Sequence, residues 1–229
     1  MPIFGSNILA GSSGQSTGVE EGGVGEYTGK SLTFDDGTSQ ILYDTPAGEG
    51  NRGLWTFSCW IKRHTLGSYQ AILGAWSDDN NRDAFRFTDG DVLNWQSVQS
   101  GTTKELVTNR KFRDTSAWYH IVLRVDTSRI EADRYRLYIN GVEETDLSTN
   151  TAHSGSSGKI NDDVIHWIGA RGHSSSPTVD SHGDFSLAAV AMVDGQSLDP
   201  SAFGHFSSGD DGTGAWVMED IPVAEAAAS

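Results

Sequence analysis

The chain has 229 residues, a size that fits one large β-sandwich or one ordinary domain. Its 16 Lys and Arg stand against 31 Asp and Glu, giving a formal net charge of −15, which excludes nucleic acid and anionic membrane surfaces as expected partners. A single cysteine, Cys59, excludes an internal disulfide framework, and the longest apolar run, Leu187–Val193, is far shorter than the roughly 18 residues of a membrane span.

Residues 1–29 differ in composition from the rest of the chain. They hold eight of the 27 glycines and no Lys or Arg, with short apolar patches at Ile3-Phe4 and Ile8-Leu9. Such a segment cannot fold alone, because ordering each residue costs roughly 1–2 kcal/mol that so little apolar surface does not offset. We expect an extended Gly/Ser-rich anchoring arm whose four apolar side chains insert into a neighbouring chain; the alternative is that the segment packs back on its own domain. The first basic residue is Lys30, so the arm lacks the charged start of a secretory signal peptide.

From residue 30 to residue 206 short β-type runs alternate with breaks rich in Gly, Asp, Asn and Ser. Apolar residues recur at every second position in these runs, and aromatic and β-branched residues are frequent, which predicts β-strands. Eight strands are expected, at Leu54–Lys62, Tyr69–Trp76, Ala84–Thr88, Val92–Ser97, Ala117–Asp126, Tyr135–Asn140, Val164–Ala170 and Phe185–Val193.

The alternation also predicts which side chains form the core, because every second residue of a strand faces the same side of its sheet. The predicted core consists of Trp55, Phe57, Ile61, Ile72, Phe85, Tyr119, Ile121, Leu123, Leu137, Ile139, Trp167 and Leu187.

Turn residues separate the strands. Asn140-Gly141 is typical of a type I′ hairpin, whose two central residues need φ > 0, and Thr88–Asp91 predicts a second turn of this kind. One helical turn is expected at Asp199–Phe203, with Asp199 as N-cap and Pro200 at the first helical position.

The last segment, residues 207–229, is an acidic and Ala-rich C-terminal tail, in which Trp216-Val217-Met218 is expected to dock on the domain. Many short strands without helices between them predict an all-β fold, an antiparallel sandwich or barrel.

Three motifs carry a family resemblance: WYHIV at Trp118–Val122, YING at Tyr138–Gly141 and DGQSLDPSAFG at Asp194–Gly204. With these motifs the chain resembles a concanavalin A-like, laminin G-like jelly roll, and more narrowly the laminin-G-like structural proteins of marine tailed bacteriophages. The resemblance implies an antiparallel jelly-roll β-sandwich over residues 30–206 and a place in the virion. It also implies a homo-oligomer, with other virion proteins as partners through the arm.

The chain departs from this resemblance at Ala188-Ala189. Many laminin G-like modules carry an acidic residue there, in a strand that flanks the ligand or metal rim. The departure removes one group on which an inherited calcium or sugar site would depend.

Two patches combine an aromatic residue with polar neighbours, as a sugar site needs, since sugar rings present C–H faces and hydroxyl edges. The first joins Trp95 with Asn94, Asp89 and Asp91, and the second places Trp76 near Asp78 and Asn81. The alternative for both is that the aromatic ring belongs to the core.

The loop after Trp76 is rich in side-chain oxygens, with Asp78, Asp79 and Asn81 as candidate ligands for calcium, which takes six to eight oxygens. Otherwise it is a polar turn. A second candidate metal group, His173, Asp180, His182 and Asp184, is interpreted as a solvated surface loop. No cofactor other than this calcium is expected.

A glycanase of the laminarinase type would need clustered carboxylates, spaced E-x-D-x-x-E along one strand. The nearest matches, Glu144-Thr145-Asp146 and Glu131-Ala132-Asp133, both lack the third acid. We therefore expect no catalytic activity.

Three functions compete on these grounds. The first is a virion structural protein, a capsid decoration, head-fibre or tail-fibre subunit that also binds glycans. The second is a stand-alone carbohydrate-binding module, and the third is a glycan-degrading enzyme, which the incomplete carboxylate sets disfavour.

Overall fold

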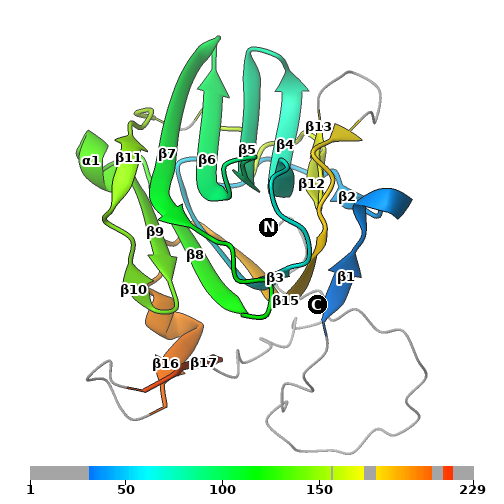
Figure 1. Ribbon diagram of the computed structural model, residues 1–229. Helices are drawn as coiled ribbons and strands as arrows, with labels where there is room; N and C mark the ends of the chain where they lie inside the picture. The colour runs from blue at the N-terminus through cyan, green and yellow to red at the C-terminus, as the bar shows by residue number, and fades with distance from the viewer. Residues whose placement is uncertain (1–30, 156, 173–178, 208–213, 219–229) are drawn as a thin grey trace, which may run out of the picture.

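The computed structural model describes residues 31–155, 157–172, 179–207 and 214–218, which form two antiparallel sheets packed face to face (Figure 1). The six-stranded sheet has the order β1 (Leu32–Phe34), β15 (Phe185–Asp194), β3 (Leu54–Arg63), β8 (Tyr119–Asp126), β9 (Tyr135–Ile139) and β10 (Val142–Glu143). The seven-stranded sheet has the order β11 (Leu147–Asn150), β7 (Thr102–Lys111), β6 (Val92–Gln99), β5 (Asn81–Phe87), β4 (Gln70–Asp78), β12 (His166–Ile168) and β2 (Leu42–Asp44).

Two small ribbons and a few short helical turns complete the described chain. The ribbons pair β13 (Arg171–Gly172) with β14 (Val179–Asp180) and β16 (Gly204–Phe206) with β17 (Trp216–Met218). The helical turns are α1 (Glu131–Arg134) and two 3₁₀ turns, at Asp36–Thr38 and Pro200–Ala202. The predicted all-β antiparallel sandwich is therefore confirmed, whereas residues 1–30 lie outside the described residues.

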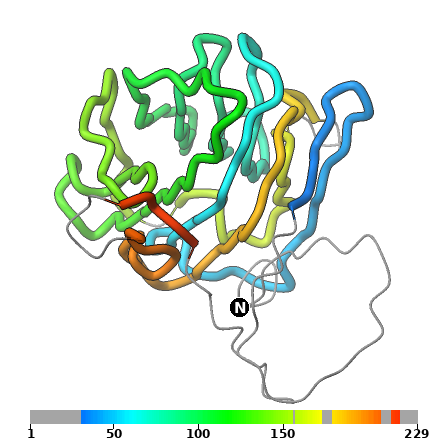
Figure 2. Tube along the Cα trace, turned by 60° about the horizontal axis from the view of Figure 1, so that its bottom comes forward, coloured from blue at the N-terminus to red at the C-terminus, as the bar shows by residue number. Residues whose placement is uncertain are grey.

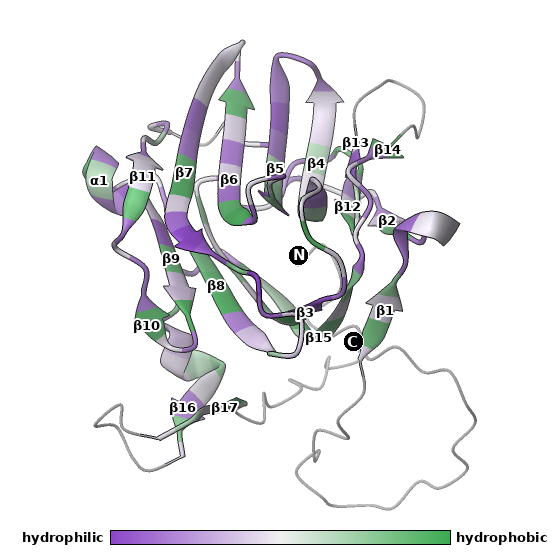
Figure 3. Ribbon diagram, viewed as in Figure 1, coloured by the Kyte–Doolittle hydropathy of each residue, from purple (hydrophilic) through white to green (hydrophobic). Residues whose placement is uncertain are grey.

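All eight predicted strands are present, with ends that differ by a few residues. The ten-residue strand β7 is not among the predicted strands, because its run TTKELVTNRK is mostly polar and has few apolar residues in alternation. Figure 3 shows β7 as largely hydrophilic, with a green band in its middle. It is a strand because β6 and β11 pair with its two edges.

The core lies between the two sheets, and all twelve predicted core residues are buried. Eleven of them belong to the main cluster of packed apolar side chains. Trp167 is the exception: Ile168 faces this cluster from β12, so Trp167 points to the opposite face of the seven-stranded sheet. Its ring is buried there under Gly172 of β13, where a Cβ would lie 2.3 Å from the ring.

The predicted turns are present, but one turn type and one N-cap differ from the prediction. Asn140 and Gly141 take φ of 50° and 79°, as a type I′ hairpin requires. The type I′ assignment of the second turn is wrong, because Asp89 and Gly90 have no positive φ and Asp91, which follows them, takes φ of 64°. The 3₁₀ turn at Pro200–Ala202 confirms the expected helical turn, but Asp199 makes no side-chain cap, because its carboxylate accepts a hydrogen bond from Arg124 instead.

Trp216 docks on the outer face of the six-stranded sheet, as predicted for this part of the tail. Its Nε1–H donates to His120 Nδ1 at 2.8 Å, and the two rings stack with centroids 5.8 Å apart. In Figure 2 the red β17 runs beside the orange segment that holds β16. The contact needs a glycine at position 141, where a Cβ would lie 2.3 Å from the Trp216 ring.

Substituting Gly141 by Ala is expected to undock this ribbon. The control is Gly195→Ala, because Gly195 also has a positive φ, 72°, but no atom within 4 Å of its Cβ position. Both variants should lose about 1 kcal/mol of stability from the strained backbone. Only Gly141→Ala should accelerate hydrogen exchange in Trp216–Met218, and equal exchange in the two variants would contradict the steric argument.

Candidate functional site

The sugar platform predicted at Trp95 is wrong. Trp95 is 1% exposed and lies in the core, edge-to-face with Trp55 at a centroid distance of 5.3 Å and with Tyr135 at 6.0 Å. The alternation of β6 turns Trp95 inward and its neighbours Asn94 and Gln96 toward the outer face of the seven-stranded sheet.

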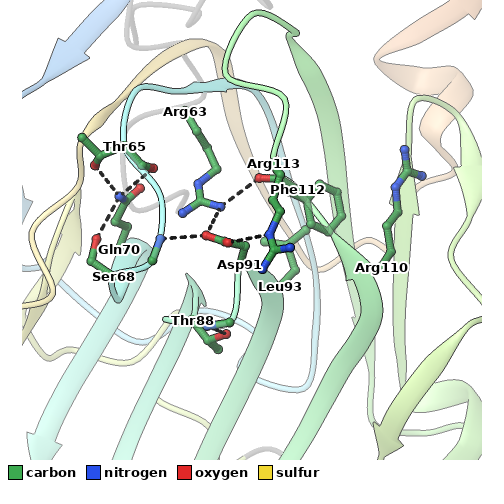
Figure 4. Close-up of polar contacts among 12 residues, drawn as sticks. Arg63, Thr65, Ser68, Gln70, Thr88, Asp91, Leu93, Arg110, Phe112 and Arg113 are labelled. Atoms are coloured by element: carbon green, nitrogen blue, oxygen red, sulfur yellow. Dashed lines mark hydrogen bonds and ion pairs between the residues drawn. The ribbon is translucent and has the colours of Figure 1, made fainter.

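Asp91 is also not a sugar ligand, because its carboxylate is already hydrogen-bonded within a buried network of the protein (Figure 4). It is 4% exposed and accepts hydrogen bonds from Arg63 Nη1 at 3.1 Å, Arg113 Nε at 2.9 Å and the Gly67 amide at 2.8 Å. Arg63 also donates to the Phe112 carbonyl at 2.9 Å. We call this set the Asp91 network. Asp89, in the same turn, is exposed, and its role stays a prediction.

The Asp91 network favours the ionised form of Asp91. Burial opposes ionisation of Asp91, but the hydrogen bonds from Gly67, Arg113 and Arg63 together outweigh it and hold the pKa of this carboxyl below its ordinary value. Arg63 is completely buried, and its guanidinium also lies 4.3 Å from the centre of the Phe87 ring. Asp91 is therefore the counter-ion of a buried cation, a structural role.

The predicted calcium ligands form the hairpin between β4 and β5. Asp78 accepts hydrogen bonds from the Asn80 amide at 2.8 Å and from Asn81 Nδ2 at 3.0 Å, while a guanidinium nitrogen of Arg82 donates to the Asp79 carbonyl. Within the described ranges no group of three or more His, Cys, Asp and Glu side chains is placed to hold a metal ion. The calcium assignment stays a prediction without a geometric site.

The second candidate metal group is dispersed. Asp180 pairs with Arg171, and Asp184 lies 3.2 Å from His64 Nδ1. His173 lies outside the described residues.

A different set of polar residues gathers on the outer face of the seven-stranded sheet. Register places Arg86 of β5 opposite Asn94 of β6, and Gln96 of β6 opposite Glu105 of β7. Arg86 Nε donates to Asn94 Oδ1 at 3.1 Å, and Gln96 Nε2 donates to Glu105 Oε1 at 2.7 Å. Asn94 Nδ2 lies 3.5 Å from the same Glu105 oxygen. These four residues form what we call the polar strip.

An exposed aromatic ring stands at one end of the polar strip. Tyr69, immediately before β4, is 46% exposed, and its ring centre lies 5.2 Å from the Arg86 guanidinium carbon. Trp76 faces the same side of the sheet, since its register partner Arg82 is on the Arg86 side of β5, but it is half-buried. The face thus offers an aromatic ring beside amide, carboxylate and guanidinium groups.

Sequence reasoning found Asn94 and missed Arg86, Glu105 and Tyr69. Glu105 lies in the strand that was not predicted, and Tyr69 was interpreted as a strand residue only. The alternation in Ala84–Thr88 does place Arg86 opposite Phe85 and Phe87, so a charged residue on the outer face was detectable there.

A cavity of about 230 Å³ lies on the other sheet, near α1. It is lined by Arg124, Asp126, Arg129, Asp133, Arg134, Arg136 and Ser197. Three of its arginines form ion pairs: Arg124 with Asp199, Arg129 with Asp126 and Arg136 with Asp133.

The carboxylates considered for catalysis lie in separate interactions. Glu131 pairs with Lys104 at 3.0 Å and Glu144 lies 3.7 Å from Arg110, while Asp146 accepts a hydrogen bond from Asn109 at 2.7 Å. Asp133 pairs with Arg136.

The two face-to-face antiparallel sheets define a β-sandwich. Residues 35–195 match the family model described as the concanavalin A-like lectin/glucanases superfamily. The chain belongs to this superfamily.

Solved structures share the fold at low sequence identity. The CBM40 of the Ruminococcus gnavus IT-sialidase is 12% identical over 71% of this chain and 95% of that chain, with a TM-score of 0.50. Domains LG4-5 of the mouse laminin alpha1 chain are 16% identical over 85% and 48%, with a TM-score of 0.51. The K499G mutant of the NanB sialidase from Streptococcus pneumoniae is 14% identical over 76% of this chain and only 26% of that chain, with a TM-score of 0.54.

A comparison with curated proteins finds no match. In the described part of the chain, no helix has the length and apolar character needed to cross a membrane.

Replacing Asp91 with Asn is expected to destabilise the fold by roughly 3–5 kcal/mol, because it leaves Arg63 buried without a counter-ion. Asp89→Asn, two residues away and exposed, should change stability by less than about 0.5 kcal/mol. Chemical denaturation at neutral pH measures both.

The same variant tests the direction of the Asp91 pKa shift. A carboxyl with a lowered folded-state pKa stabilises the fold above its unfolded pKa and loses that contribution as the pH falls through the folded value. The wild type should therefore lose more stability on acidification than Asp91→Asn, and parallel pH profiles would contradict the shift.

Proposed function

We propose that the protein is a non-catalytic carbohydrate-binding domain whose ligand lies on the polar strip beside Tyr69. The observation that carries the proposal is this juxtaposition of an exposed aromatic ring with amide, carboxylate and guanidinium groups on one sheet face. The ring provides an apolar surface for the C–H face of a sugar, while the polar groups provide donors and acceptors for its hydroxyls.

Structural relatives are consistent with this proposal at the level of the fold. A structure of the Ruminococcus gnavus CBM40 bound to alpha2,3 sialyllactose is 14% identical, with a TM-score of 0.50. The absence of catalysis is also a proposal: it is supported by the separate ion pairs and hydrogen bonds that hold Glu131, Asp133, Glu144 and Asp146.

Substituting Tyr69 by Ala is expected to weaken glycan binding at least about tenfold, equivalent to 1.4 kcal/mol. Tyr43→Ala is the control: Tyr43 is 63% exposed, but it lies on β2, which β12 and β4 separate from β5. A glycan array followed by titration of the best ligand measures both variants. Equal losses, or no glycan bound by the wild type, would refute the proposal.

For the whole chain we propose a structural role on the particle of a tailed bacteriophage, as a capsid decoration, head-fibre or tail-fibre subunit in a homo-oligomer. The support is the family resemblance together with the composition of residues 1–29. The chain enters the described fold at β1, which pairs with β15 at an edge of the six-stranded sheet. In this proposal residues 1–29, which precede this edge strand in the chain, anchor the domain to a neighbouring virion protein through Ile3, Phe4, Ile8 and Leu9.

Deleting residues 1–24 should leave the melting temperature of the isolated domain nearly unchanged and abolish incorporation into particles. The control retains the full length and replaces only Ile3, Phe4, Ile8 and Leu9 with Ser, which should also prevent incorporation. A truncated domain with a much lower melting temperature, or one that still assembles, would contradict the anchoring role.

A further inference from the structure

Arg86 is a nearly buried cation that makes no ion pair with any residue that the structure describes. Its side chain lies on the outer face of β5, the residue is 9% exposed, and no carboxylate of a described residue is within ion-pair distance of it. Buried charges in proteins are normally paired, because a desolvated ion costs several kcal/mol. Arg63, the other arginine that is buried among the described residues, follows this rule through Asp91.

The guanidinium of Arg86 is held in position at one side only. Its Nε–H donates to Asn94, whereas its two Nη groups make no hydrogen bond to any described residue. They are also not among the buried nitrogens that lack a partner, so they reach the accessible surface of the face. A planar guanidinium fixed at Nε presents its two Nη groups as a fork that matches a carboxylate.

Neighbouring charges do not neutralise Arg86, because each is engaged elsewhere. Burial and the repulsion of Arg171 lower the pKa of Arg86, and Glu105 and Asp180 oppose that shift only in part. Glu105 accepts a hydrogen bond from Gln96, and Asp180 holds Arg171 through two hydrogen bonds, of 2.9 and 2.5 Å.

We propose that the glycan bound on the polar strip is acidic, and that a carboxylate of the uronic-acid type pairs with the Nη groups of Arg86. This inference rests on the proposed carbohydrate-binding function. The ligand supplies the counter-ion that the fold does not, while Asn94, Gln96 and Tyr69 contact its neutral part. The overall charge of −15 would repel a polyanion at long range, so recognition depends on the local contact with Arg86.

The test compares matched ligands that differ only in the carboxyl group. Uronic-acid trisaccharides, such as β-1,4-trimannuronate and trigalacturonate, are titrated beside their carboxyl-reduced counterparts, together with a sulfated galactan fragment. We expect the acidic trisaccharide of at least one pair to bind at least tenfold more tightly than its neutral counterpart.

Substitutions at Arg86 and Arg82, both on β5, test whether Arg86 causes the preference for the acidic ligand. Arg86→Gln removes the charge and should abolish the preference for the acid, whereas Arg86→Lys keeps the charge without the fork and should retain part of it. Arg82→Gln is the matched control, because Arg82 lies on the same face of β5 and donates to the Asp79 carbonyl. It should bind like the wild type. Circular dichroism confirms the fold of each variant, and Arg86→Lys keeps the test open if Arg86→Gln does not fold.

The outcomes separate the two proposals. Equal binding of acid and neutral ligands, or an acid preference that survives Arg86→Gln, overturns the acidic ligand and leaves the carbohydrate-binding function standing. Binding of the sulfated fragment alone overturns the carboxylate assignment. No binding by any ligand, including those of a broad array, overturns both.

Discussion

The buried ion pair between Arg63 and Asp91 connects the two sheets at one end of the sandwich. Arg63 is the last residue of β3 in one sheet, and Asp91 directly precedes β6 in the other. Because the carboxylate also binds the Gly67 amide, the pair fixes the connection between β3 and β4. Tyr69 lies in that connection, so the position of the aromatic ring beside the polar strip depends on a charge pair in the interior.

The strands that could be predicted from the sequence are those that bury one complete face. β3 and β8 alternate apolar and other residues over eight or more positions, and their core residues lie where the alternation places them. β7 was not predicted because it is held in the sheet by backbone pairing with β6, and its mostly polar side chains show no alternating apolar pattern. Trp167 shows a further limit, since in the three-residue strand β12 the pattern is too short to decide which face is the inner one.

The candidate site was harder to predict because its geometry depends on contacts between residues far apart in the chain. Asp91 looked like a free acidic residue of a turn, and its role follows from Arg63, 28 positions earlier. Trp95 looked like a binding platform because aromatic residues serve both cores and sugar sites, and only the register of β6 decides between them. The polar strip combines residues of β5, β6 and β7 that no local motif links.

Because Trp216 donates a hydrogen bond to His120, the attachment of the ribbon of β16 and β17 depends on the protonation state of this histidine. Since Nδ1 of His120 accepts the indole hydrogen, its Nε2 carries the ring proton and donates to Ser58 Oγ at 2.9 Å, so the ring is neutral. Burial lowers the pKa of His120 to about 4. A proton on Nδ1 would remove the acceptor of the Trp216 hydrogen bond. Protonation of His120 therefore weakens docking, and docking weakens protonation by the same free energy. The ribbon therefore stays attached at neutral pH, and its attachment weakens as the pH falls toward the folded-state pKa of His120, about 4.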